Sequence, residues 1–177
     1  CMPPSPDAMV FGELAQVAAD GGNDIGLDEA ALLFAAACGR VVAPGATRSI
    51  AASGRDRRRM VEAALWLDAK AQDPIDLAST ARAAGLSPYH FLRLFSRVLG
   101  VTPHQYLVRA RLRRGARLLA DSTLPITEVA FDAGFAYLSN FVRTFRRAAG
   151  VSPREFRRAA NGNRKIFQES AGLRSVG

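Results

Sequence analysis

Beyond residue 54 the apolar positions follow the period of an α-helix, and no stretch alternates apolar and polar residues as a half-buried strand does. The spacing predicts a helix over residues 55–72 that ends at Asp73-Pro74. Its predicted apolar face holds Val61, Ala64, Leu65 and Leu67. Two shorter helical patterns precede it, over 8–20 and 27–38, and a linker of small residues covers 40–54. Residues 161–177 lack periodicity and predict a flexible tail.

A pattern in the helical region occurs twice. Residues 91–103 match 141–153, since both copies read Phe-x-Arg-x-Phe and both end in Gly, Val, a hydroxyl residue and Pro. Upstream, residues 81–86 match 130–135 with an offset of 49 rather than 50. One residue is therefore inserted in the second copy, just after the glycine. A turn between two helices tolerates such an insertion.

Each copy predicts a helix-turn-helix. A short helix (76–84; 126–133) ends at Gly85 or Gly134, and Ser87 or Ser139 caps a second helix. The second helices bury one face each, formed by Phe91, Phe95 and Val98 and by Phe141, Phe145 and Ala148. Thr102-Pro103 and Ser152-Pro153 then open the next helices. Between the copies, residues 104–120 predict a linker helix about 25 Å long.

The basic residues concentrate in the same region. The chain has 24 Lys and Arg against 16 Asp and Glu, a net charge of +8. Residues 1–50 hold six acids and two bases, which leaves 22 bases and 10 acids beyond them. All but two of the bases are Arg, whose planar fork suits phosphates and guanine edges. This asymmetry favours a polyanionic partner for the second part of the chain.

Several other classes of protein find no support. His90 and His104 are the two histidines, and the sequence has no metal-ligand spacing, phosphate-binding loop or nucleophile elbow. We therefore predict no enzyme activity, no cofactor and no metal. The longest apolar run, 30–38, is about half the length of a membrane span. Cys1 and Cys38 cannot form a disulfide framework, so a cytoplasmic location is expected.

Residues 55–158 closely resemble the DNA-binding domain of the AraC/XylS family of bacterial transcription regulators. The residues that carry the resemblance are Gly134, Phe135, Phe141, Arg143, Phe145, Arg146, Gly150, Ser152, Pro153 and Phe156. It implies an all-α domain of about seven helices, in which two helix-turn-helix subdomains joined by a long linker helix bind adjacent major grooves, usually in an activator. Family members commonly carry a separate effector-binding or dimerisation domain. Residues 1–54 are too few and too helical for one, and resemble the helices that connect it to the DNA reader.

The predicted domain organisation is therefore a helical N-terminal segment or remnant of a sensor domain (1–54), a DNA-binding domain (55–160) and a tail (161–177). The recognition helices are predicted over 87–99 and 138–149. Their outward faces hold the predicted DNA-binding residues Tyr89, His90, Leu92, Arg93, Ser96 and Arg97, and Ser139, Asn140, Val142, Arg143, Arg146 and Arg147.

The chemistry of these side chains suggests their roles. The resemblance implies base contacts for the equivalent Arg93 and Arg143, each worth about 1–3 kcal/mol if it binds a guanine with two hydrogen bonds. Asn140 suits adenine or a phosphate. Tyr89, Leu92 and Val142 suit thymine methyls, and Arg97, Arg146 and Arg147 suit phosphates. Five further arginines lie on the linker helix, and for these both contacts with the DNA backbone and pairing with acidic side chains stay open: Arg109, Arg111, Arg113, Arg114 and Arg117. Core positions are predicted for Trp66, Tyr106 and Phe156.

The resulting hypothesis is a sequence-specific transcription regulator whose partners are double-stranded DNA and RNA polymerase. One alternative is an architectural protein that binds DNA without sequence preference. Another is a helical module that binds a protein partner or forms a homodimer through its N-terminal helices, with Leu14, Val17 and residues 30–38 as the contact patch. A homodimer formed through a domain outside this chain is also open.

Overall fold

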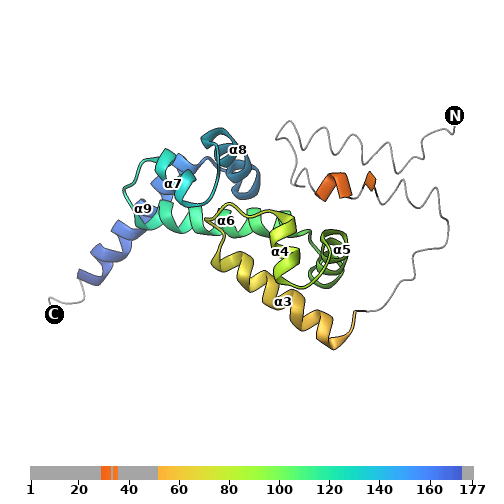
Figure 1. Ribbon diagram of the computed structural model, residues 1–177. Helices are drawn as coiled ribbons and strands as arrows, with labels where there is room; N and C mark the ends of the chain where they lie inside the picture. Colours follow the sequence, from red (N-terminus) through yellow and green to blue (C-terminus); the bar gives the residue numbers. More distant parts are fainter. Residues whose placement is uncertain (1–28, 33, 36–51, 173–177) are drawn as a thin grey trace. The chain divides into compact units, whose positions relative to one another are not determined.

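The computed structural model describes residues 29–32, 34–35 and 52–172, and every regular element within these ranges is an α-helix (Figure 1). Residues 29–32 and 34–35 are helical, and the helices after them are α3 (Gly54–Ala69), α4 (Leu77–Ala83), α5 (Pro88–Leu99), α6 (Pro103–Asp121), α7 (Ile126–Asp132), α8 (Leu138–Ala149) and α9 (Pro153–Gly172). The all-α prediction is confirmed, and the two predicted helix-turn-helix pairs are α4–α5 and α7–α8. The predicted helix at 8–20 and most of the linker at 40–54 lie outside the described residues.

Helix α3 begins with reciprocal capping. The backbone N–H of Ser53 donates to Asp56 Oδ2 at 3.0 Å, and that of Asp56 donates to Ser53 Oγ at 3.1 Å. These bonds satisfy two backbone donors at the start of the helix, which otherwise have no partner within it. Hydrogen bonding to Ser53 lowers the pKa of Asp56. The helix ends at Ala69, three residues before the predicted end.

The buried face of α3 differs from the predicted one. Met60, Ala63, Ala64 and Leu67 are buried, and they follow the i, i+3, i+4, i+7 spacing of one helix face. The prediction was wrong for Val61 and Leu65, which are 47% and 62% exposed. Each lies one residue, or about 100°, around the helix from a buried position. It was also wrong for Trp66, which stands at the edge of this face and is 37% exposed.

The turns inside the two helix-turn-helix pairs have the same hydrogen bonds. The N–H of Leu86 donates to Ala81 O at 2.9 Å, and the N–H of Phe135 donates to Ala130 O at 3.0 Å. Both bonds close the end of the first helix around a glycine with positive φ. The connection runs over 84–87 in the first pair and over 133–137 in the second, which confirms the insertion of one residue.

One compact unit contains the described residues up to Lys70 together with Ile75–Arg109. Its core includes Phe91 and Phe95, both fully buried, with ring centroids 5.3 Å apart. Phe95 meets the edge of Tyr106 at 5.7 Å, and the hydroxyl of Tyr106 donates to Asp68 Oδ2 at 3.2 Å. Tyr106 therefore packs on the core, as predicted, and keeps a polar contact at its half-buried end.

The described N-terminal residues belong to this first unit. Glu29 is buried, and its Oε1 accepts the backbone N–H of His104 at 2.5 Å in the first turn of α6. A carboxylate is stabilised there by the unsatisfied N–H groups of the helix. Of the predicted partner-binding patch, Ala30 is buried and Phe34 is exposed, while Leu14, Val17 and Cys38 lie outside the described residues.

The second unit contains Ala71–Pro74 and the chain from Ala110 onward. Its core joins α6, α7 and α8 through buried Leu119, Val129, Ala130, Ala133, Phe135, Phe141 and Phe145. The rings of Phe135, Phe141, Phe145 and Phe156 form a series with successive centroids 5.2–5.5 Å apart. Phe156 thus packs at the edge of this core, as predicted.

Helix α9 departs from the expected flexible tail. It opens with reciprocal capping, since Ser152 N donates to Glu155 Oε2 at 2.8 Å and Glu155 N donates to Ser152 Oγ at 3.3 Å. It then continues to Gly172, so the prediction of a tail without structure from 161 was wrong for 161–172. Once a first turn is held in place, each further residue adds a backbone hydrogen bond, and a helix extends without an apolar periodicity of its own.

Candidate nucleic-acid interface

Helix α5 is positioned by a cap and a buried aromatic face. Ser87 Oγ accepts the N–H of His90 at 3.3 Å, which confirms Ser87 as the N-cap, and Pro88 occupies the first turn. Phe91 and Phe95 fix the inward face. On the other side, His90 and Arg97 are exposed and Tyr89, Arg93 and Ser96 are half-buried.

Two of the predicted contact residues on α5 meet each other. The guanidinium carbon of Arg93 lies 5.5 Å from the ring centroid of Tyr89, and Arg93 Nη1 donates to the Tyr89 hydroxyl at 3.4 Å. The aromatic face attracts the cation and restricts the rotamers of the long arginine side chain. Arg93 is therefore held on the outward side of α5 before any ligand binds.

Leu92 does not belong to the outward face. It is 1% exposed, so its predicted contact with a thymine methyl was wrong. The apolar positions Phe91, Leu92 and Phe95 follow the i, i+1, i+4 spacing, which gives a wider buried face than the i, i+4, i+7 face of the prediction. Val98, predicted to be buried, is half-buried.

Helix α8 begins in a different way from α5. Its N-cap residue is Tyr137, in an extended conformation, and no described side chain caps the helix there. The predicted cap, Ser139, lies inside the first turn and is exposed. The prediction failed because the inserted residue moves the start of the helix relative to the glycine, so that Tyr137 takes the place that Ser87 has in the first pair.

The outward face of α8 is basic. Ser139, Arg143, Arg146 and Arg147 are exposed, and α8 contains no acidic residue. Asn140 is half-buried, and its Oδ1 accepts from Thr144 Oγ1 at 3.1 Å and from Arg143 Nη2 at 3.5 Å. The amide of Asn140 would therefore have to exchange these bonds in order to read adenine.

The inward face of α8 differs from the predicted one. Thr144 is buried beside Phe141 and Phe145, whereas Ala148, predicted to be buried, is exposed. Val142 is half-buried and packs against the core of the second unit. Only part of its side chain remains available for the predicted thymine contact.

Two linker arginines support the second unit. Arg111 Nε donates to Ala71 O at 2.8 Å and Arg111 Nη2 to Asp73 O at 3.0 Å. Burial lowers the pKa of Arg111, although an arginine stays charged at neutral pH. Arg114 Nε donates to the carbonyl of Asp132, the last residue of α7, at 2.8 Å. Arg109, Arg113 and Arg117 are exposed.

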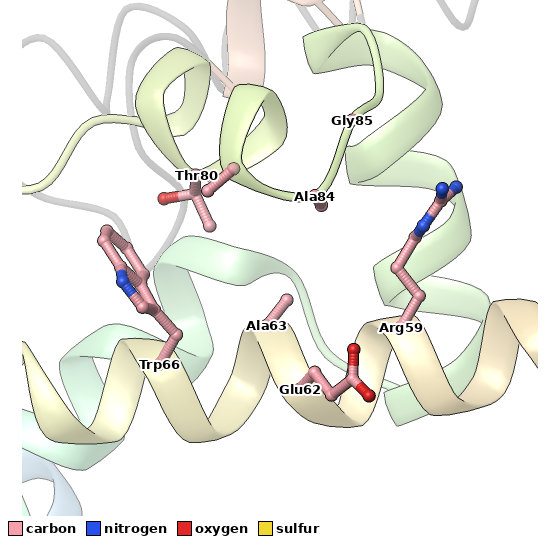
Figure 2. Close-up of a pocket in the computed structure, with 8 residues that line it drawn as sticks. Arg59, Glu62, Ala63, Trp66, Thr80, Ala84 and Gly85 are labelled. Atoms are coloured by element: carbon pink, nitrogen blue, oxygen red, sulfur yellow. The ribbon is translucent and has the colours of Figure 1, made fainter.

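A cavity of about 440 Å³ lies in the first unit between α3 and α4. Arg59 and Trp66 come from α3 and stand at its two ends, and Thr80, Ala84 and Gly85 face them from α4 and the following turn (Figure 2). Trp66 is partly exposed because it forms a wall of this cavity. None of the predicted DNA-binding residues lines it.

Within the described ranges, no three His, Cys, Asp or Glu side chains gather in a way that would hold a metal ion. None of the helices described has both the length and the apolar character that crossing a bilayer requires.

One exposed residue next to the predicted set was missed by the sequence pattern. Tyr137 is 71% exposed, the largest value among the large hydrophobic residues described. The signal was present in the repeat, because Tyr137 lies 50 positions after Ser87, but the assignment of Ser139 as the cap hid it.

Comparison with known proteins identifies this architecture. A family model described as a helix-turn-helix domain matches residues 80–159. The probable transcriptional regulator LumQ of Photobacterium leiognathi is 35% identical over 57% of this chain and 41% of its own length. The transcriptional activator RhaS of Escherichia coli is 33% identical over 55% of this chain and 35% of its own. The chain thus spans less than half the length of these curated relatives.

Solved structures agree with the sequence relatives. An AraC-type transcriptional regulator from Chromobacterium violaceum is 27% identical with a TM-score of 0.57, over 61% of this chain and 96% of the other. The DNA-binding domain of AdpA, solved with a target DNA, is 30% identical with a TM-score of 0.58, over 60% and 96%.

The fold and these relatives define a double helix-turn-helix DNA-binding domain. Residues 80–159 belong to the helix-turn-helix domains of the AraC type, as the resemblance to the AraC/XylS family implied. The relatives cited are named for transcription regulation or DNA binding, and none for an enzyme activity.

Proposed function

We propose that this chain is the DNA-reading part of a sequence-specific transcription regulator, with α5 and α8 as recognition helices that enter adjacent major grooves. The observation that carries the proposal is the matched pair Arg93 and Arg143. They occupy equivalent positions of the repeat, on the outward faces of two helices that contain no acidic residue. An arginine in this position can bind guanine O6 and N7 with two hydrogen bonds.

The remaining outward residues supply two kinds of contact. Arg97, Arg146 and Arg147 are exposed near the C-terminal ends of the two helices, and we assign them to phosphates, which set register without reading sequence. His90, Ser96 and Ser139 are polar and accessible to base edges or phosphates. Relatives that share this domain support the proposal, because the AdpA domain was solved with a target DNA and RhaS is named an activator.

The proposal extends to the biological setting. A regulator of this kind acts on promoters in the bacterial cytoplasm, and activation requires contact with RNA polymerase. Dimerisation, through the N-terminal helices or a further domain, would place two such readers on one operator.

The test is selection of binding sites from randomised DNA duplexes at near-physiological salt. We expect an asymmetric motif with two informative blocks about one helical turn apart. Replacing both arginines (Arg93→Ala with Arg143→Ala) should remove most discrimination between the selected site and random DNA, a loss of about 30-fold or more if each contact contributes 1–3 kcal/mol.

The matched control removes the same charge from α6, through Arg109→Ala with Arg117→Ala, both exposed. It should leave the ratio of specific to random binding unchanged, because the loss of phosphate contacts weakens binding to all sequences alike. Flat enrichment of the wild-type chain would instead indicate a backbone binder, and discrimination that survives the double recognition-helix variant would contradict the proposal.

A further inference from the structure

Tyr137 is exposed at the start of α8. The residue is 71% exposed, and its backbone is extended at φ −137° and ψ 135°. An aromatic ring left in water contributes little to the stability of the fold, since the hydrophobic effect rewards removal of apolar surface from water. Packing within the chain therefore does not account for an aromatic ring at this position.

The comparison with α5 strengthens this argument. At the equivalent place Ser87 caps α5 through its hydroxyl, whereas Tyr137 has no side-chain atom that reaches the first-turn N–H groups. Serine is among the preferred residues at an N-cap, and tyrosine is not. The second unit thus carries a large exposed ring where a small capping residue would stabilise the helix.

The residues next to Tyr137 indicate which kind of partner its ring contacts. Ser139 follows it in the first turn of α8, Arg143 lies one turn further along, and all three side chains are exposed. In helix-turn-helix proteins the N-terminal residues of the recognition helix contact the base edges. Tyr89 is not a second example, because its ring is half-buried and already holds Arg93.

We propose that Tyr137 is a specificity-determining residue of the second recognition helix, whose ring packs against the C5-methyl group of a thymine in the major groove. The apolar edge of the ring suits this methyl group, which distinguishes thymine from the other bases on that side of the duplex. This inference rests on the proposed function and adds to it one base preference that depends on neither Arg93 nor Arg143.

The test uses the full 177-residue chain with Tyr137→Ser, which copies the residue of the first unit. A new cap should raise the melting temperature, by up to several degrees. Loss of the base contact should lower affinity for the selected site about five-fold or more, and the preference for thymine at one position should disappear. A residue with only a structural role would not move stability and affinity in opposite directions.

A second measurement isolates the methyl group. Uracil in place of thymine at that position removes the C5-methyl and nothing else, so it should weaken the wild-type chain and leave Tyr137→Ser unaffected. The variant Tyr137→Phe, which keeps the ring, should retain the thymine preference. Leu65→Ser is the matched control, since Leu65 is 62% exposed on α3 and should leave the thymine preference unchanged.

The outcomes separate this inference from the proposed function. If Tyr137→Ser binds the selected site with wild-type affinity and preference, the inference is overturned while sequence-specific binding stands. If uracil weakens both proteins equally, the methyl contact belongs to another residue and the inference is also overturned. If the wild-type chain selects no site at all, the proposed function fails first.

Discussion

The two helix-turn-helix pairs of this chain share a sequence pattern and a turn geometry but differ in how each recognition helix is held. In the first pair, Ser87 caps α5 and Tyr89 holds Arg93. In the second, α8 has Tyr137 at its start, and Asn140 bonds to Arg143 and Thr144. Repetition thus preserved the buried aromatic residues and the glycine turn, while the residues that orient the basic side chains diverged. Under the proposed function, this difference predicts that the two pairs read different base pairs.

The largest expected effect concerns the two cores. Phe91→Ala and Phe141→Ala each remove a fully buried ring and should cost about 3–5 kcal/mol of unfolding free energy. The single tryptophan of the chain, Trp66, lies in the first unit, so its fluorescence reports that unit. Phe91→Ala should lower the midpoint of the fluorescence transition in urea more than Phe141→Ala does. Equal shifts from both variants would show that the two units unfold as one.

The two turn glycines should respond unequally to alanine. At Gly85 (φ +64°) the nearest atom to an added Cβ is Arg59 Nη2 at 3.8 Å, so the cost is the left-handed strain of about 1–2 kcal/mol. At Gly134 (φ +96°) the Cβ would also collide with the carbonyl of Ala71 and lie 2.9 Å from Arg111 Nε. Crowding adds about 1–3 kcal/mol there. Urea unfolding of both variants measures the difference, and an equal loss would contradict the packing at Gly134.

Arg111 should matter to stability, although the sequence left contacts with the DNA backbone and pairing with acids equally open for the five linker arginines. In Arg111→Lys, a single ammonium group cannot donate to both carbonyls as the guanidinium fork does. A buried carbonyl left without a donor lowers the unfolding free energy by about 1–3 kcal/mol. The exposed Arg117→Lys is the control and should leave stability within about 0.5 kcal/mol. Chemical denaturation measures the stability of both variants, and identical stabilities would argue against the structural role of Arg111.

Substitutions at the starts of α5 and α8 should change stability by a smaller amount. Ser87→Ala removes a bonded cap and should lower stability by about 1 kcal/mol. Ser139→Ala is expected to change it by less than about 0.5 kcal/mol, because Ser139 lies inside the helix and caps nothing. Thermal unfolding at constant pH compares the two. A larger loss from Ser139→Ala would restore the capping role that the sequence pattern predicted.

The smallest expected effect depends on pH. Hydrogen bonds from Ser79 lower the pKa of Asp76, the N-cap of α4, below its ordinary value of 3.8. The N-cap of α7 is Pro125, which has no carboxylate. A carboxyl group whose pKa is lowered by folding stabilises the fold above its unfolded pKa, and that stabilisation is lost as the pH falls through the folded value.

Acidification below pH 3.8 should therefore weaken the start of α4, and Asp76→Asn should reduce this part of the pH dependence. The readout is Trp66 fluorescence during thermal unfolding at about pH 6 and about pH 3, above and below the ordinary pKa of 3.8 at which the loss begins. Asp56 in the same unit and Glu155 in the second also have a lowered pKa, so the chain as a whole should lose stability in acid. An unchanged pH dependence in Asp76→Asn would contradict the role of this cap.

Much of this architecture could be predicted from the sequence, because the interactions that determine it are local. Gly85 and Gly134 marked the turns, Ser87, Thr102 and Ser152 marked helix starts, and the repeat with its offset of about 50 residues located both recognition helices. The bounds of α5 and α8 agree with the predictions to within a residue. Capping and turn formation involve atoms only a few residues apart, so a short stretch of sequence contains the whole interaction.

Only the tertiary structure decided which faces became buried and which arginines support the fold. Leu92 packs inside while Tyr137 remains in water, and Arg111 bonds to carbonyls 38 and 40 residues away. These outcomes depend on the rotation of each helix against neighbours that are distant in sequence, where a shift of one residue turns a side chain by about 100°. The periodicity of the sequence determined that each helix has an apolar face, and packing against those neighbours set the edges of that face.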